Sequence, residues 1–94
     1  MTKEDVLKRV LSYYGLKVED IQTSKRSNNA VNARELLFFC LIHYKLSDYE
    51  KIAKAFNTSV DVVQQARSRI ADKFNRGIPY VMYAIETIEL PESI

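Results

Sequence analysis

The stretch Tyr49–Ser68 decides the fold, and it reads Tyr49-Glu-Lys-Ile-Ala-Lys-Ala-Phe-Asn-Thr-Ser-Val-Asp-Val-Val-Gln-Gln-Ala-Arg-Ser68. Its apolar residues recur at helical spacing up to Asn57, which suits the left-handed position after a helix. Thr58 or Ser59 can cap a second helix directly afterwards. Two helices joined by about two residues are the layout of a helix-turn-helix, which we expect over about 48–75.

Helix signals continue on both sides of this stretch. Thr2 with Asp5 resembles a capping box at the start of a first helix, and Pro79 suits the first position of a last one. Leu36 to Ile42 is apolar almost all round, which is typical of a helix at the centre of a bundle. Caps and apolar stripes together predict helices at about 3–14, 31–45, 48–56, 59–75 and 79–89.

Two shorter segments connect these helices. Ser47 with Glu50 forms a Ser-x-x-Glu capping box, which predicts the start of the helix at 48–56. The short segment from Leu16 to Ile21, which is rich in apolar residues, is predicted to form one helical turn. The wholly polar segment 22–29 is predicted to form a loop.

The length and composition of the chain limit the possible fold classes. A chain of 94 residues is the size of one domain, and 47% hydrophobic residues are enough for one core. Two glycines and two prolines leave long uninterrupted stretches, which favours helices. We therefore expect an all-α fold over 1–94, a compact single domain of five to six helices. The apolar run Leu36–Ile42 is far shorter than the roughly 20 residues of a membrane span, and the polar start is unlike a signal peptide, so a soluble, cytoplasmic protein is expected.

The sequence contains few residues that could catalyse a reaction or bind a metal ion. The single cysteine, Cys40, and the single histidine, His43, cannot form a disulfide or a zinc site of Cys and His ligands. Both lie in or beside the apolar run, so we interpret them as core or core-edge residues. No phosphate-binding glycine loop or hydrolase motif is present. We expect no enzymatic activity, cofactor, metal or small-molecule substrate.

Charge is unevenly distributed along the chain. Residues 25–76 carry ten basic and five acidic groups, whereas 77–94 carry three acidic groups and no basic one. A basic middle block suits a polyanion, although a solvated charged face would have the same composition.

Packing of the second helix of the motif fixes which side chains face outward. Val63 and Ala66 are expected to pack that helix against the first. The side chains left facing outward are then Ser59, Val60, Asp61, Gln64, Gln65 and Ser68. In a major groove, Gln can bond adenine, Ser a base or phosphate, and Val60 a thymine methyl. Asp61 would repel phosphate unless it accepts from cytosine. Two helices joined by a tight turn also occur in bundles that bind no DNA.

Five segments match known motifs in order and spacing. They are Val6–Ile21 (an aromatic-Gly turn, then Val-x-Asp-Ile), Ser24-Lys-Arg-Ser27 (a basic loop), Val31-Asn-Ala-Arg-Glu-Leu-Leu37 (Val-x-Ala-Arg-Gln-Ile-Ala), Ile52-Ala-Lys-Ala-Phe56 (Ile-Gly-x-Ala-Phe) and Val63-Gln-Gln-Ala-Arg-Ser-Arg-Ile70 (Val-x-His-Ala-x-x-Lys-Ile). Over about residues 2–74 the chain resembles the C-terminal DNA-binding domain of the bacterial chromosomal replication initiator DnaA. The resemblance implies a fold of the Trp-repressor type and double-stranded DNA as partner.

The resemblance also bears on the DNA contacts. The family's Gly-Gly-Arg-Asp-His-Ser/Thr-Thr/Ser signature is replaced by Asn57-Thr-Ser-Val-Asp-Val62, one residue shorter, which places Thr58, Ser59, Val60 and Asp61 at its base-reading edge. A diverged base readout is therefore expected. Phosphate contacts are expected from Lys25, Arg26 and Arg34, from the backbone N–H groups of the capped turn near Thr58 and Ser59, and on the flank from Arg67, Arg69 and Lys73.

Two functional hypotheses follow. The first is a small DNA-binding module that acts as a replication or transcription accessory in a bacterium or phage. The alternative is a protein-interaction module that keeps the fold without specific DNA binding. In that case the last helix, with Tyr80, Tyr83 and Ile88, would dock a partner, unless these residues pack onto the domain's own core.

Overall fold

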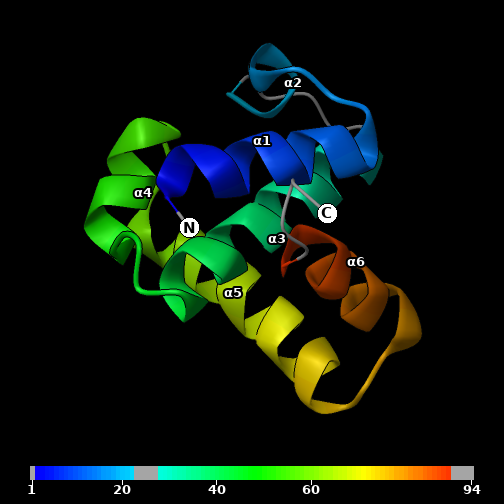
Figure 1. The fold of residues 1–94 in the computed structure, drawn as a ribbon. Helices are drawn as coiled ribbons and strands as arrows, with labels where there is room; N and C mark the ends of the chain where they lie inside the picture. The colour runs from blue at the N-terminus through cyan, green and yellow to red at the C-terminus, as the bar shows by residue number, and fades with distance from the viewer. Residues whose placement is uncertain (1, 23–27, 90–94) are drawn as a thin grey trace.

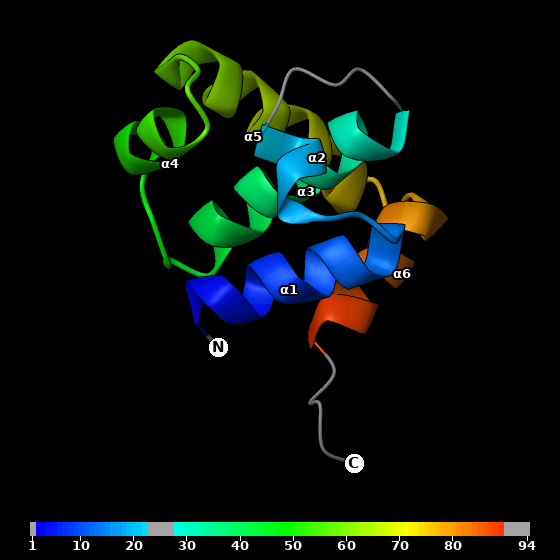
Figure 2. The same ribbon diagram turned by 90° about the horizontal axis from the view of Figure 1, so that it is seen from above.

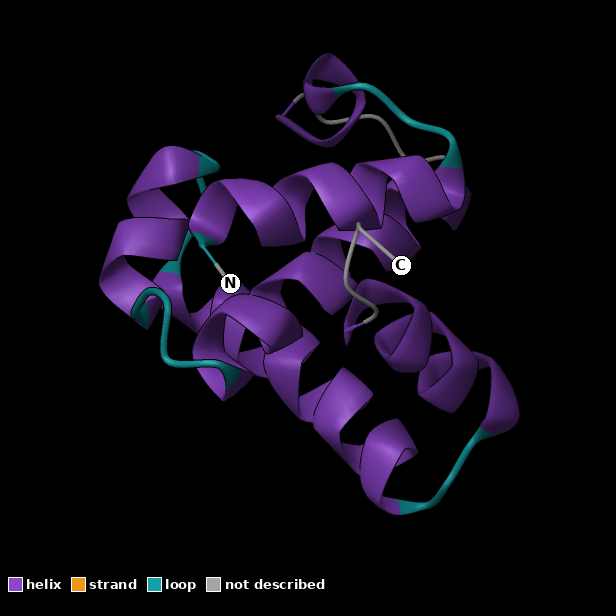
Figure 3. Cartoon of the chain, in the orientation of Figure 1, coloured by secondary structure: helices purple, strands orange, loops and turns teal. Residues whose placement is uncertain are grey.

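The computed structural model describes residues 2–22 and 28–89, and within these ranges the chain forms six helices and no strand (Figures 1 and 3). The helices are α1 (Lys3–Tyr14), α2 (Val18–Gln22), α3 (Asn28–His43), α4 (Tyr49–Ala55), α5 (Val60–Asn75) and α6 (Pro79–Glu89). The all-α prediction is confirmed. The predicted contacts Lys25 and Arg26 lie outside the described residues, as does the side chain of Ile88.

Local chemistry sets most of the helix ends as predicted. The Thr2 hydroxyl accepts from the Asp5 N–H at 3.2 Å, and the Asp5 carboxylate accepts from the Thr2 N–H at 3.1 Å, which completes the capping box of α1. The bond that the Asp5 carboxylate accepts from the Thr2 N–H, aided by the Thr2 side chain, holds the pKa of Asp5 below its ordinary value. Asn57 adopts the expected left-handed conformation (φ 52°), and Pro79 is the first residue of α6.

Two helix starts differ from the prediction. Helix α3 begins at Asn28, so Asn28 and Asn29 form its first turn rather than the end of a loop. Helix α4 is capped by Asp48, whose Oδ1 accepts from the Lys51 N–H at 2.8 Å, and the Ser47 capping box was wrong. The reason is that the Ser47 N–H is already used at the end of α3, where it donates to the Leu41 carbonyl at 3.2 Å.

Helix α3 runs through the centre of the molecule, between α1 and α5 (Figures 1 and 2). All its residues from Glu35 to Leu41 are buried, which confirms the prediction of a central helix. Helix α5 packs on it through a stripe that comprises Val63, Ala66 and Ile70. The burial of apolar side chains on every side of α3 is the main stabilising contribution to this fold.

Helix α6 packs against α1 and α5 by one face only. Val81, Ala84 and Ile85 are buried on that face, as expected for a helix that rests on the domain's own core. Tyr80 and Tyr83 lie on the exposed side, and 63% of Tyr83 is accessible. None of the helices in 2–22 and 28–89 is both long and apolar enough to cross a membrane.

Candidate nucleic-acid interface

The turn between α4 and α5 is closed by backbone hydrogen bonds. The Thr58 N–H donates to the Ala53 carbonyl at 2.9 Å across the left-handed residue Asn57. The Ser59 hydroxyl then accepts from the Val62 N–H at 3.2 Å and caps α5. The helix-turn-helix predicted over 48–75 is therefore present, with a turn of defined geometry.

This closure removes one of the backbone N–H groups expected to meet phosphate near Thr58 and Ser59. The N–H of Thr58 is already bonded to the Ala53 carbonyl. The physical reason is that the last carbonyls of α4 need donors, and the residues just after the left-handed position supply them. Thr58 can contribute its side chain to an interface, not this N–H group.

Most of the side chains predicted to face outward from α5 do so. Ser59 at the cap is exposed, and four exposed residues follow it along the helix. With Arg69 these four line an open hollow of about 350 Å³, formed by Asp61, Gln64, Gln65 and Ser68. The hollow consists of hydrogen-bonding side chains, which is the composition that base-edge and phosphate recognition require.

Val60 is the exception. It is half-buried and packs against the core, because it lies three residues before the buried Val63 on the same helix face. The exposed valine is Val62, 46% of which is accessible. The outward orientation predicted for Val60 was therefore wrong.

A groove of about 260 Å³ lies beside this face, between the start of α3 and the α4–α5 turn. It brings together Arg34 and Thr58, two of the predicted contact residues that are separated along the chain. Arg34 is half buried and interacts with neighbouring residues, so it reaches the groove edge rather than open solvent. The groove is lined by Val31, Arg34, Glu35, Phe38, Phe56, Thr58, Val62, Ala66 and Arg69.

One ion pair in this groove was not anticipated from the sequence. Arg69 Nε on α5 donates to Oε2 of Glu35 on α3 at 2.6 Å, and Arg69 Nη2 forms an ion pair with the same oxygen at 2.5 Å. Only 9% of Glu35 is accessible, the lowest exposure of any charged residue in the described part of the chain. A carboxylate in a buried helix was the available signal, because a buried charge needs a partner.

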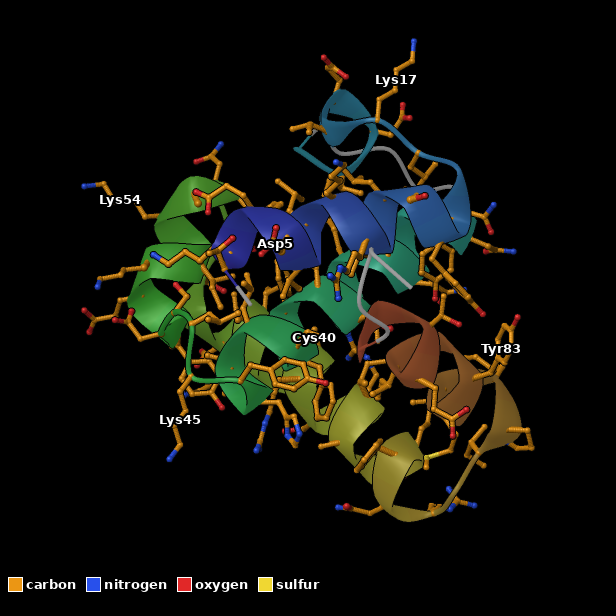
Figure 4. The ribbon with its side chains drawn as sticks, in the orientation of Figure 1. Asp5, Lys17, Cys40, Lys45, Lys54 and Tyr83 are labelled. Atoms are coloured by element: carbon orange, nitrogen blue, oxygen red, sulfur yellow. The ribbon has the colours of Figure 1, made fainter. Side chains whose placement is uncertain are left out.

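The basic residues expected on the flank are not simple solvated cations. The ammonium group of Lys73 lies 5.6 Å from the centre of the Tyr80 ring, Arg67 is half buried, and Arg69 is held by Glu35. By contrast, Lys45 and Lys54 point away from the molecule (Figure 4).

Cys40 is fully buried inside the bundle (Figure 4), as the sequence predicts. His43 is exposed at the end of α3, and its ring stacks on that of the buried Phe39 with centroids 5.1 Å apart, so it borders the core without being part of it. Within residues 2–22 and 28–89, no group of three His, Cys, Asp or Glu residues is arranged to hold a metal ion.

The family described as the bacterial dnaA protein helix-turn-helix matches residues 3–70. The chain belongs to this family. The match begins with α1 and includes the whole α4–α5 turn and the exposed face of α5, whereas α6 lies beyond it. No curated protein matches the chain.

Membership gives the candidate interface a context. The DnaA helix-turn-helix is a DNA-binding domain, so this chain is a DNA-binding type of module. The DnaA motifs quoted above have Gln and Lys at the positions of Glu35 and Arg69. The buried ion pair therefore distinguishes this chain from the pattern it otherwise follows.

Proposed function

We propose that this chain binds double-stranded DNA through α5, as an accessory factor in replication or transcription in a bacterium or phage. The observation that carries the proposal is the hydrogen-bonding face of Asp61, Gln64, Gln65 and Ser68, exposed directly after a helix-turn-helix turn of the DnaA family. It acts by binding alone, without enzymatic activity, cofactor or metal, in the cytoplasm at the nucleoid.

In this proposal the N-terminal half of α5 enters the major groove. Gln64 and Gln65 meet base edges, where each amide can form a bidentate contact with adenine. Lys25, Arg26 and Arg34 anchor phosphates, and such contacts position the protein without reading sequence. Because the family signature is replaced at 57–62, the preferred site differs from the family's origin repeat.

The test is the salt dependence of binding to a fluorescent duplex of random sequence. If about four phosphates are neutralised, log affinity falls with log salt at a slope of about −3 to −4. Lys25→Ala is expected to flatten the slope by about one. Lys8→Ala is the matched control, because Lys8 is exposed on α1, across α3 from α5 (Figure 2). Failure to bind at low salt and micromolar protein would refute the proposal.

A protein partner is the second candidate. The exposed aromatic rings of Tyr80 and Tyr83 favour it, because they lie on α6, outside the family match. A chain that binds no duplex, or binds it independently of salt, would support this alternative. If DNA binding is the function, replacing both tyrosines by serine leaves duplex affinity unchanged.

A further inference from the structure

The Glu35–Arg69 pair lies at the border between two surfaces. Glu35 lines the groove at the start of α3, and Arg69 lines both that groove and the open hollow of α5. The carboxylate side chain is 12% accessible, while 53% of the Arg69 side chain is accessible. One end of the pair is thus fixed in the protein and the other reaches solvent at the candidate DNA face.

The contacts of Arg69 use one edge of its guanidinium group. The planar group has two edges that each carry a pair of N–H donors. Glu35 Oε2 accepts from Nε and forms an ion pair with Nη2, and these two nitrogens form one edge. The other edge, formed by Nη1 and Nη2, has no partner among the described residues. An edge of this shape matches the spacing of two phosphate oxygens, and charge-assisted bonds of this kind are among the strongest in proteins.

We propose that Glu35 is a positioning residue for DNA binding: it holds Arg69 so that the free guanidinium edge grips a backbone phosphate beside the base-reading face of α5. The inference rests on the proposed function and adds to it a specific phosphate contact and the residue that orients it. Arg69 follows Gln65 by one helical turn, which places it toward the groove wall while the glutamines reach the base edges.

Glu35 could also lower the affinity for DNA, and this effect acts against the positioning of Arg69. A carboxylate near the DNA repels phosphate, and a paired arginine contributes less charge than a solvated one. If repulsion dominated, removing the carboxylate would tighten binding. If positioning dominates, removing it weakens binding, although the net charge of the chain rises from +2 by one unit. The direction of the change in affinity therefore distinguishes positioning from repulsion.

The experiment compares four proteins in the same duplex assay: the wild type, Glu35→Gln, Arg69→Ala and the double variant. Glu35→Gln is expected to weaken binding about threefold to tenfold, because the arginine loses its charged support. In the Arg69→Ala background the same change is expected to tighten binding, because it then removes only an unpaired carboxylate. Glu86→Gln, an equal charge change at an exposed site on α6, is the control and should not weaken binding.

Thermal unfolding of each variant establishes that binding is measured on folded protein. Should Glu35→Gln fail to fold, Arg69→Lys replaces it, because lysine keeps the charge but has no second edge. Its binding is expected to weaken about as much as that of Arg69→Ala, and wild-type affinity would overturn the proposal. Tighter binding of Glu35→Gln in both backgrounds would overturn the positioning role alone. Absence of duplex binding by the wild type would overturn the proposed function and this inference together.

Discussion

Phe38 on α3 meets Phe56 at the end of α4 edge to face, with ring centroids 5.1 Å apart and planes inclined by 72°. Phe56 directly precedes the left-handed Asn57, so this contact ties the helix-turn-helix turn to the central helix. The orientation of α5, and with it the candidate DNA face, therefore depends on the packing of α3.

Leu37→Ala tests the central position of α3. Leu37 is 1% accessible, so truncation loses its burial and leaves a cavity, and the expected loss of unfolding free energy is about 2 to 5 kcal/mol. Urea denaturation followed by circular dichroism measures it. A loss below about 1 kcal/mol would mean that the site collapses around the smaller side chain or contributes little to the core.

The start of α4 offers a direct comparison of two neighbouring residues. Asp48→Ala is expected to cost about 1 kcal/mol, because the Lys51 N–H loses its acceptor. Ser47→Ala is expected to cost about 0.5 kcal/mol or less, because its contact with α3 is made by the backbone N–H, which alanine retains. Equal costs in the same denaturation assay would contradict this assignment of the cap.

Local chemistry explains why most helix bounds could be predicted. The Thr2–Asp5 box, the left-handed Asn57 and Pro79 each act through neighbours within a few residues, so sequence spacing is sufficient to recognise them. The start of α3 was misplaced because Asn28 and Asn29 are polar, and polarity alone does not distinguish a loop from the exposed first turn of a helix.

The candidate site was less predictable because it depends on tertiary packing. Val60 and Val62 have the same chemistry, and only the rotation of α5 on α3 determines which one is exposed. Glu35 and Arg69 are 34 residues apart, so no local pattern pairs them. Ser47 and Asp48 are both good caps, and the hydrogen bond from Ser47 to Leu41 decides between them.

Tyr14 provides a pH test of packing at the end of α1. Burial raises the pKa of Tyr14 from 10.0 to about 12, and neighbouring Tyr13 adds to the rise. The folded chain thus keeps the phenol proton between about pH 10 and 12, while the unfolded chain releases it. Stability is therefore expected to fall as the pH rises through this window. Tyr14→Phe should reduce that fall, as measured by denaturation across the window, and an unchanged pH profile would contradict the burial of this hydroxyl.

Base readout by α5 is tested at Gln64 and Gln65. Replacing either by Ala is expected to relax preference at one or two base pairs and to cost about 1 to 3 kcal/mol at the preferred site. Both side chains are exposed, so folding should not change. Selection of duplexes from a random pool, with parent and variants in parallel, gives the preference. A double variant that selects the same sequences as the parent would exclude base readout through these amides.

The two valines of α5 give a test of apolar readout. Val62 is exposed and Val60 packs against the core, so a thymine methyl group in the major groove can contact Val62. Replacing thymine by uracil in a selected duplex removes only that methyl, and the wild type should then bind more weakly at the contacted position. Val62→Ala should bind both duplexes equally. Val60→Ala, the matched control, should lower stability through lost packing but keep the discrimination. Discrimination that disappears with Val60→Ala and survives in Val62→Ala would reverse the assignment and imply that α5 is rotated when it binds DNA.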